Sequence, residues 1–168
     1  MHMTPEELRS RLQAAKQLQA GSARRIQAHR ELAEQCPACV PNLLSLSRSL
    51  LLDRQDTGAQ ERFDEGEQAL RLAVESSGED ASALVELAHF LDVVRDSPEE
   101  AEPLFAEAAQ RASKLLEEAW AGWIGVLSQQ EKFDAALELS SRAQRVFPDS
   151  ELIAEATALV RQSAAREE

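Results

Sequence analysis

Tyrosine is absent from the sequence, which also holds only two cysteines, two tryptophans, six glycines and six prolines. Two cysteines cannot cross-link a chain of 168 residues into a disulfide-stapled fold. No uninterrupted apolar run approaches the ~20 residues that a membrane-spanning helix needs. The first residues carry no charged segment followed by an apolar run, so we expect no secretory signal. These absences favour a protein of the cytoplasm that does not enter the membrane.

Positive charge is also scarce, because 18 lysines and arginines stand against 30 aspartates and glutamates, a formal net charge of -12. An acidic surface repels the phosphates of DNA and RNA, so a nucleic-acid partner is not expected. The same repulsion disfavours binding to anionic lipid.

Hydrophobic residues make up 43% of the chain, enough to build a core. Alanine, leucine, glutamate, glutamine and arginine dominate, and β-branched residues are sparse. These common side chains lose little rotamer freedom in a helix. The composition therefore predicts an all-α fold.

Small and apolar residues recur at a fixed distance along the chain, spaced four and then three residues apart within each set. This spacing places each set on one face of a helix. We call these three segments the B-helices, and successive sets lie 35 residues apart. The sets are Gly66, Leu70 and Ala73, then Ala101, Phe105 and Ala108, then Ala136, Ser140 and Ala143.

A second series of apolar residues, spaced three and then four apart, precedes each B-helix. These A-helices carry Leu43, Leu46 and Leu50, then Leu84, Leu87 and Leu91, then Trp120, Trp123 and Leu127. The first A-helix lies further upstream of its B-helix than the others do. We therefore expect a longer first connection, over residues 53–60.

This pattern resembles the tetratricopeptide repeat family, whose ~34-residue motif has a tryptophan, leucine, glycine and tyrosine on helix A, then alanine, phenylalanine and alanine on helix B, and a closing proline. The third repeat matches with Trp120, Leu127, Ala136, Ala143 and Pro148. The resemblance covers roughly residues 41–148. It implies an α-solenoid of helical hairpins, a right-handed superhelical array with a terminal capping helix.

Local signals divide the chain around these repeats. Thr4 to Glu7 form a capping box with proline at the first helical position, and Gly21-Ser22 breaks an N-terminal helix pair. The predicted parts are residues 1–3, a cloning remnant and start; 4–37, a helix pair that is a degenerate repeat or a cap; 38–148, three repeats of about 40–79, 80–114 and 115–148; and 149–168, a capping helix.

Cys36 and Cys39 form a C-x-x-C pair, the one motif with chemical potential. A redox role expects such a pair after a strand and at the start of a helix, and no strand is predicted nearby. A zinc site needs two further ligands, for which His29 and His89 are the soft candidates. The interpretation we favour is two small apolar residues in a turn between repeats, with a thiol or metal role as the alternatives.

No motif for catalysis or cofactor binding appears elsewhere. The sequence has no glycine-rich phosphate loop, no paired histidines of a metalloprotease and no nucleophile elbow. His29 lies on an apolar stripe, where a hydrogen-bonded core histidine is expected. We therefore predict a non-enzymatic protein without a cofactor.

The family resemblance implies that a partner binds along the concave face, which A-helices line. Positions beside the packing stripe then become the candidate binding residues. They are Leu44, Arg48 and Leu51 in the first repeat, Val85, His89 and Asp92 in the second, and Ala121, Gly125, Ser128 and Gln129 in the third. The lysine and asparagine clamp with which some members hold acidic chaperone tails is missing from these positions.

The sequence as a whole predicts a scaffold or adaptor that binds a peptide or helix of another protein. A basic or amphipathic helix suits the negative charge of the chain. The alternatives are a small secretion-type chaperone for an exported subunit, and self-association into a homo-oligomer through the large tryptophans. Trp120 and Trp123 are otherwise expected in the core of the repeat.

Overall fold

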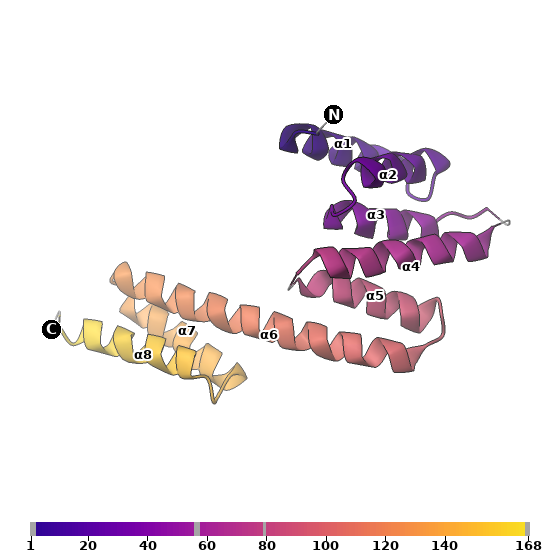
Figure 1. The fold of residues 1–168 in the computed structure, drawn as a ribbon. Coiled ribbons are helices and arrows are strands. Elements are labelled where there is room, and N and C mark those ends of the chain that lie inside the picture. The colour runs from indigo at the N-terminus through magenta and orange to yellow at the C-terminus, as the bar shows by residue number, and fades with distance from the viewer. Residues whose placement is uncertain (1–2, 56–57, 79, 167–168) are drawn as a thin grey trace. The chain divides into compact units, whose positions relative to one another are not determined.

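The computed structural model describes residues 3–55, 58–78 and 80–166, which form eight α-helices and no strand (Figure 1). The expected remnant at residues 1–2 and part of the expected long connection, residues 56–57, lie outside this part of the chain. The helices are α1 Pro5–Gln17, α2 Ala23–Gln35, α3 Val40–Leu51, α4 Ala59–Ser76, α5 Ala81–Val93, α6 Pro98–Gln129, α7 Phe133–Val146 and α8 Glu151–Ala164. The all-helical, tetratricopeptide-like fold is confirmed.

The chain divides into two compact units, unit 1 at Met1–Ala109 and unit 2 at Gln110–Glu168. Unit 1 contains α1 to α5 and the beginning of α6. Unit 2 contains the remainder of α6 with α7 and α8. Each unit has its own apolar core, and each is described separately below.

The N-terminal part of the chain forms two helices, α1 and α2. The Thr4 side chain accepts a hydrogen bond from the Glu7 amide, and the Glu7 carboxylate accepts one from the Thr4 amide. Gly21, in the turn between the helices, has a φ of +72°, and a Cβ there would lie 2.2 Å from the Leu52 carbonyl oxygen. Only glycine combines that dihedral angle with that closeness. Glycine at this position therefore allows the turn between α1 and α2 to lie close to the end of α3.

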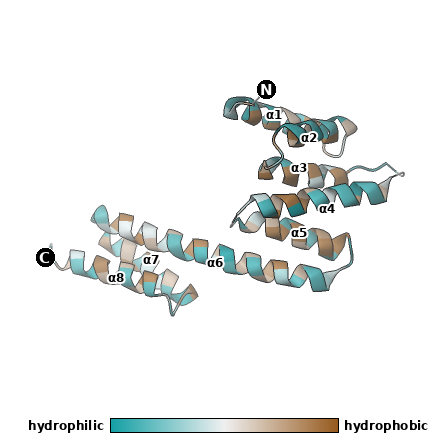
Figure 2. Cartoon of the chain, viewed as in Figure 1, coloured by the Kyte–Doolittle hydropathy of each residue, from teal (hydrophilic) through white to brown (hydrophobic). Residues whose placement is uncertain are grey.

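Unit 1 is built around α3, α4 and α5. The stripes predicted for its first two A-helices are fully buried, and those of its B-helices are buried except for Phe105, which is partly exposed. Figure 2 shows the alternation of hydrophobic and hydrophilic residues along these helices. Gly66 stands where the family motif has alanine, and close packing explains the difference. A Cβ at this position would lie 3.3 Å from Ser47 Oγ and 3.4 Å from the Phe90 ring. α4 can approach α3 and α5 this closely because that position has no side chain.

Ion pairs join neighbouring helices at the surface of unit 1. Arg30 on α2 makes two hydrogen bonds to the Glu65 carboxylate on α4, at 2.6 and 2.7 Å. Arg95, just after α5, contacts both Asp64 and Glu67 on α4 and lies over the Phe90 ring. These contacts are partly or fully solvent-exposed, so they fix orientation more than they add stability.

One structural feature departs from the expected repeat. The boundary predicted between residues 114 and 115 falls inside α6, a single helix of 32 residues. The segment from Ala109 to Glu118 contains no glycine or proline, and its leucine, alanine, lysine and glutamate residues are strong helix formers. Nothing in the local sequence stops the helix there.

The core of unit 2 lies between α6, α7 and α8. Ile124, Ala136, Ala143, Ile153 and Val160 are each completely buried in it. The predicted stripe on α6 is wrong at one place, because Trp123 is 54% exposed whereas the adjacent Ile124 faces the core. Trp120 is partly buried and meets the Phe147 ring edge to face, with the ring centroids 5.9 Å apart.

Candidate partner-binding groove

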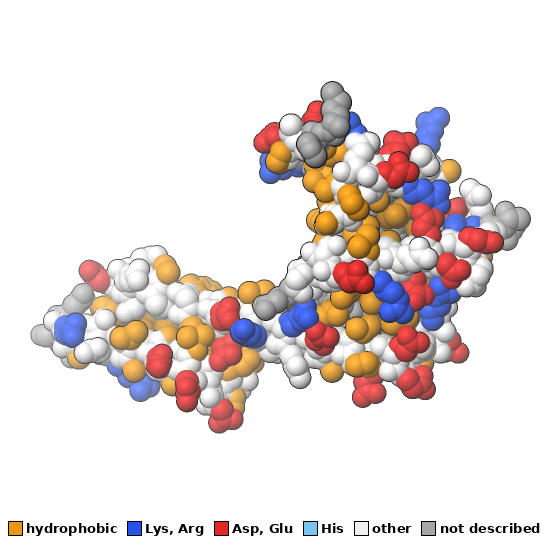
Figure 3. Space-filling model, in the orientation of Figure 1, with side chains coloured by type: hydrophobic (Ala, Val, Ile, Leu, Met, Phe, Trp, Pro, Cys, Tyr) orange, Lys and Arg blue, Asp and Glu red, His pale blue; other side chains and the backbone are white. Residues whose placement is uncertain are grey.

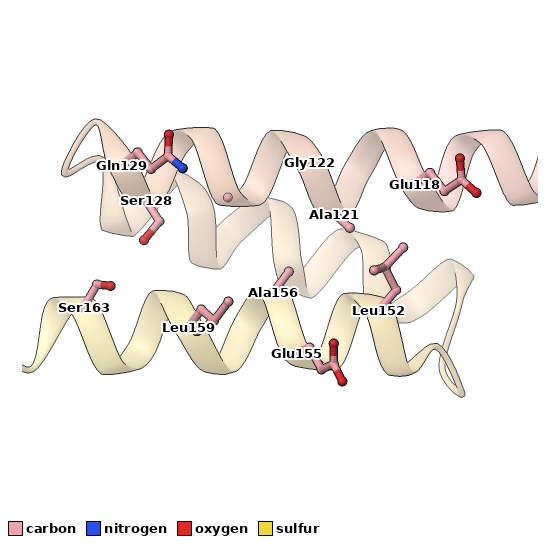
Figure 4. A pocket seen from close by; sticks show the side chains of 11 residues that line it. Glu118, Ala121, Gly122, Ser128, Gln129, Leu152, Glu155, Ala156, Leu159 and Ser163 are labelled. Atoms are coloured by element: carbon pink, nitrogen blue, oxygen red, sulfur yellow. The ribbon is translucent and has the colours of Figure 1, made fainter.

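A groove of about 630 Å³ runs along unit 2 between α6 and α8. One wall comes from a single face of α6, where the spacing of three, four and seven residues keeps the lining positions together. In Figure 4, Leu152, Ala156 and Leu159 project from α8 toward that face. The lining residues on α6 are Glu118, Ala121, Gly122, Gly125, Ser128 and Gln129, and those on α8 are Leu152, Glu155, Ala156, Leu159 and Ser163.

Two glycines lie on the α6 wall in the interior of the helix. A Cβ built at Gly122 or Gly125 would meet no other atom within 4 Å. Packing inside the chain as described therefore does not require glycine at either position. Each glycine in a helix interior costs about 0.5–1 kcal/mol relative to alanine. The groove thus carries a destabilising feature that the fold of unit 2 does not explain.

The groove combines apolar side chains with negative charge. Leu152 is 41% and Leu159 62% exposed, a large fraction for leucine in a folded domain. Glu118 and Glu155 lie on opposite walls and are both exposed. Figure 3 shows hydrophobic side chains gathered on the visible face of unit 2, with acidic side chains beside them. The surface of the groove is therefore apolar along its length and acidic at Glu118 and Glu155.

The residues predicted for the third repeat come together in this groove. Ala121, Gly125, Ser128 and Gln129 all line it. They are predicted from the family resemblance together with helical spacing, and all four lie on the α6 wall. What sequence reasoning missed is the opposite wall, because α8 was interpreted only as a cap. Leu152 and Leu159 could have been noticed, since the apolar residues of α8 cover more of the helix than one core-facing stripe requires.

The residues predicted for the first repeat divide between the core and the surface of unit 1. Leu44 is buried, with 8% exposed, so its side chain serves mainly the core beneath the N-terminal helix pair. Arg48 is exposed and forms an ion pair with Glu86 on α5. Leu51 is 38% exposed near the end of α3.

The second-repeat candidates lie on α5. Val85 is partly buried, whereas His89 and Asp92 are exposed. The His89 ring meets the Phe105 ring edge to face, with centroids 4.9 Å apart. None of the three lines the α6–α8 groove.

His29 is the hydrogen-bonded core histidine that the sequence predicts. It is fully buried, and its Nδ1 donates to Asn42 Oδ1 at 2.8 Å, while Asn42 Nδ2 donates to the His29 carbonyl at 2.8 Å. Burial lowers the pKa of His29, and the positive charges of Arg25 and Lys16 lower it further against the opposing effect of the Asn42 hydrogen bond. The lowered pKa favours the neutral form of the ring.

Cys36 and Cys39 occupy the turn between α2 and α3. Cys36 ends α2 and is partly buried, and Cys39 begins α3 with 9% exposed. Burial raises the pKa of the Cys39 thiol, which disfavours the reactive thiolate. In residues 3–55, 58–78 and 80–166, no group of three histidine, cysteine or acidic side chains is placed to hold a metal ion.

No helix within the described part of the chain is both long and apolar enough to cross a lipid bilayer.

Comparisons with known proteins place these features in a family context. A family model described as the Myxococcota tetratricopeptide repeat protein family matches residues 1–78. A protein of Myxococcus xanthus described as an uncharacterized 18.1 kDa protein in the carS 3′ region is 46% identical over 161 residues, which cover 95% of each chain. No solved structure gives a significant match.

Proposed function

This chain belongs to the Myxococcota tetratricopeptide repeat protein family, and we propose that it is a non-enzymatic adaptor that binds an amphipathic helix of a partner protein in the α6–α8 groove. Tetratricopeptide repeats form a fold that generally mediates interactions between proteins. The observation that carries the proposal is the pair of groove glycines whose absent side chains leave open space. A helical partner would use that space.

Small residues allow two helix backbones to approach closely. Ala121, Gly122 and Gly125 form a flat strip on α6 that has almost no side-chain bulk. A partner helix can lie on this strip and place its own apolar side chains between Leu152 and Leu159. The cost of the glycines in the free protein is then offset in the complex.

Charge determines the second property of the partner. Glu118 and Glu155 border the groove, and the whole chain carries a net charge of -12. A helix with lysine or arginine beside its apolar face would be attracted, whereas an acidic helix would be repelled. The proposed ligand is therefore a basic amphipathic helix with alanine and leucine on its buried face.

The test uses a synthetic peptide with this pattern, alanine and leucine on one face and lysine on the other. A control peptide has the same composition in an order that is not amphipathic. Binding to the full chain is measured by fluorescence anisotropy, and the Gly122 and Gly125 amide signals are followed by NMR. We expect Gly125→Leu to weaken binding by about tenfold or more, because the new side chain occupies the strip.

Ala119→Leu is the matched control, because Ala119 is exposed on α6 but does not line the groove. It should leave the affinity unchanged. Equal binding of the peptide to Gly125→Leu and to the original chain would contradict the proposal, as would equal binding of the two peptides.

A further inference from the structure

A second cavity, in unit 1, has the opposite electrostatic character. It has a volume of about 520 Å³ and lies beside the start of α3, where Lys16 of α1 and Arg25 of α2 face it. Arg48 of α3 and the beginning of α5 complete its border. Three cationic side chains thus line one cavity of a strongly acidic chain, against the single carboxylate of Asp80.

Arg25 is held in place with unused hydrogen-bonding capacity. Its guanidinium Nη1 donates to the Leu18 carbonyl at 3.3 Å, which orients the group. Its Nε is buried and has no hydrogen-bond partner among the residues that the structure describes. Among the described residues, neither Arg25 nor Lys16 has an acidic side chain within ion-pair distance. Because Nε is buried, an oxyanion in the cavity would meet the other guanidinium donors of Arg25, whose planar arrangement suits a planar or tetrahedral oxyanion.

The other charges at the cavity are already satisfied inside the protein. Arg48 makes a two-pronged contact with Glu86. Asp80 caps α5, and its carboxylate accepts hydrogen bonds from the Ser82 amide at 2.9 Å and the Ser82 hydroxyl at 2.7 Å. Among the described residues, the cavity charges left without an oppositely charged partner are therefore the two cations, Lys16 and Arg25.

The positive charges of Lys16 and Arg25 also act on the buried His29 ring nearby. The positive charges of Arg25 and Lys16 both contribute to the lowered pKa of buried His29, after the larger effect of burial. An anion placed between them would reduce the field at His29 and raise its pKa.

We propose that this cavity binds the oxyanion of a peptide side chain, with the anionic group between Lys16 and Arg25. The apolar part of the wall, Val40, Pro41 and Leu44, favours an anionic residue that stands next to an apolar one. A glutamate or aspartate carboxylate and a phosphoserine share this chemistry. The site lies wholly in unit 1 and does not depend on the α6–α8 groove, so the two proposals fail separately.

The experiment titrates the ¹⁵N-labelled full chain with three short blocked peptides that differ at one position beside a leucine. That position is glutamate, phosphoserine or glutamine. The Arg25 Nε–Hε signal and the His29 ring signals are followed by NMR. We expect one or both charged peptides to shift these signals and the glutamine peptide to bind at least about tenfold more weakly. The ratio between the charged peptides identifies the preferred oxyanion.

Variants separate this site from general electrostatic attraction. Arg25→Gln and Lys16→Gln should each weaken the charged peptide by about five- to tenfold. Arg24→Gln removes the same charge from the adjacent, exposed position outside the cavity and should change the affinity less than about twofold. Lys16 is exposed, so its variant tests the site even where Arg25→Gln alters folding.

Three results would overturn the proposal. One is binding of the glutamine peptide as tight as that of the charged peptides. Another is an equal loss of affinity in Arg24→Gln and Arg25→Gln. The third is the absence of any Arg25 or His29 shift with both charged peptides.

Discussion

At the scale of single residues, His29 and Asn42 form a closed polar pair inside unit 1. Each hydrogen-bonds the other across the α2–α3 contact, and His29 is completely buried. The remaining ring nitrogen, Nε2, has no hydrogen-bond partner in the described part of the chain. The neutral ring tolerates this better than a protonated ring would, because a buried unpaired charge costs far more than a buried lone pair.

This arrangement predicts an acid-sensitive core. The folded pKa of His29 is lowered, so the unfolded chain takes up the proton first. Stability should be at its full value above the unfolded pKa and should decrease as pH falls through about 6.5. Urea unfolding followed by circular dichroism between about pH 8 and 5.5 would measure the slope.

His29→Gln should flatten that slope, since glutamine does not titrate. His89→Gln is the control, because His89 is exposed on α5 and its removal leaves the buried pair intact. An unchanged slope in the His29 variant would refute this explanation of the acid sensitivity.

At the scale of the element, α4 and α6 use glycine for different reasons. Gly66 on α4 lies against Ser47 and Phe90, so a side chain at this position would be tightly packed in unit 1. Gly125 on α6 has no close neighbour at the position of a Cβ. The same substitution should therefore have different consequences in the two helices.

Gly125→Ala should stabilise the chain by about 0.5–1 kcal/mol, because alanine loses less backbone entropy in a helix. Gly66→Ala gains the same propensity, but its methyl group would lie 3.3 Å from Ser47 Oγ and 3.4 Å from the Phe90 ring. Because these side chains must then shift slightly, we expect the gain to be smaller or reversed. Chemical unfolding of the two variants beside the original protein would test the difference. If both were equally stabilised, the packing role assigned to Gly66 would be wrong.

At the scale of the whole molecule, negative charge and exposed apolar groups oppose each other. The net charge of -12 produces electrostatic repulsion between copies of the chain at neutral pH. Large apolar side chains are nevertheless exposed, among them Leu115, Trp123 and Leu159. Repulsion therefore limits association through these surfaces.

Association should consequently increase as the pH approaches the isoelectric point of about 4.8, where the repulsion vanishes. Light scattering across the pH range would detect it. Leu159→Glu should reduce this association more than Ala158→Glu, which adds the same charge at an adjacent exposed position but leaves the leucine in place. Equal effects of the two variants would show that charge alone, and not the groove, controls association.

Sequence periodicity predicts the helices of unit 1 well, because their stripes are local properties of the chain. Leu43, Leu46 and Leu50 were assigned to the core from their spacing, and all three are buried. Helical spacing also brought Ala121 and Gly125 onto one face before any neighbour was known. The sequence prediction was wrong at Trp123, which is exposed, whereas Ile124 is buried in the core. The large side chain of the tryptophan and its position in the family motif favoured it over Ile124.

The sequence by itself determined the all-helical fold, the repeat family and the faces of most helices, since these follow from spacing, composition and capping within a few turns of chain. Only the tertiary structure decided that α8 forms the second wall of a groove and that Lys16 and Arg25 share a cavity with α3. The physical reason is that a binding surface joins side chains distant in sequence. Which of them meet depends on packing between helices, and no local pattern encodes it.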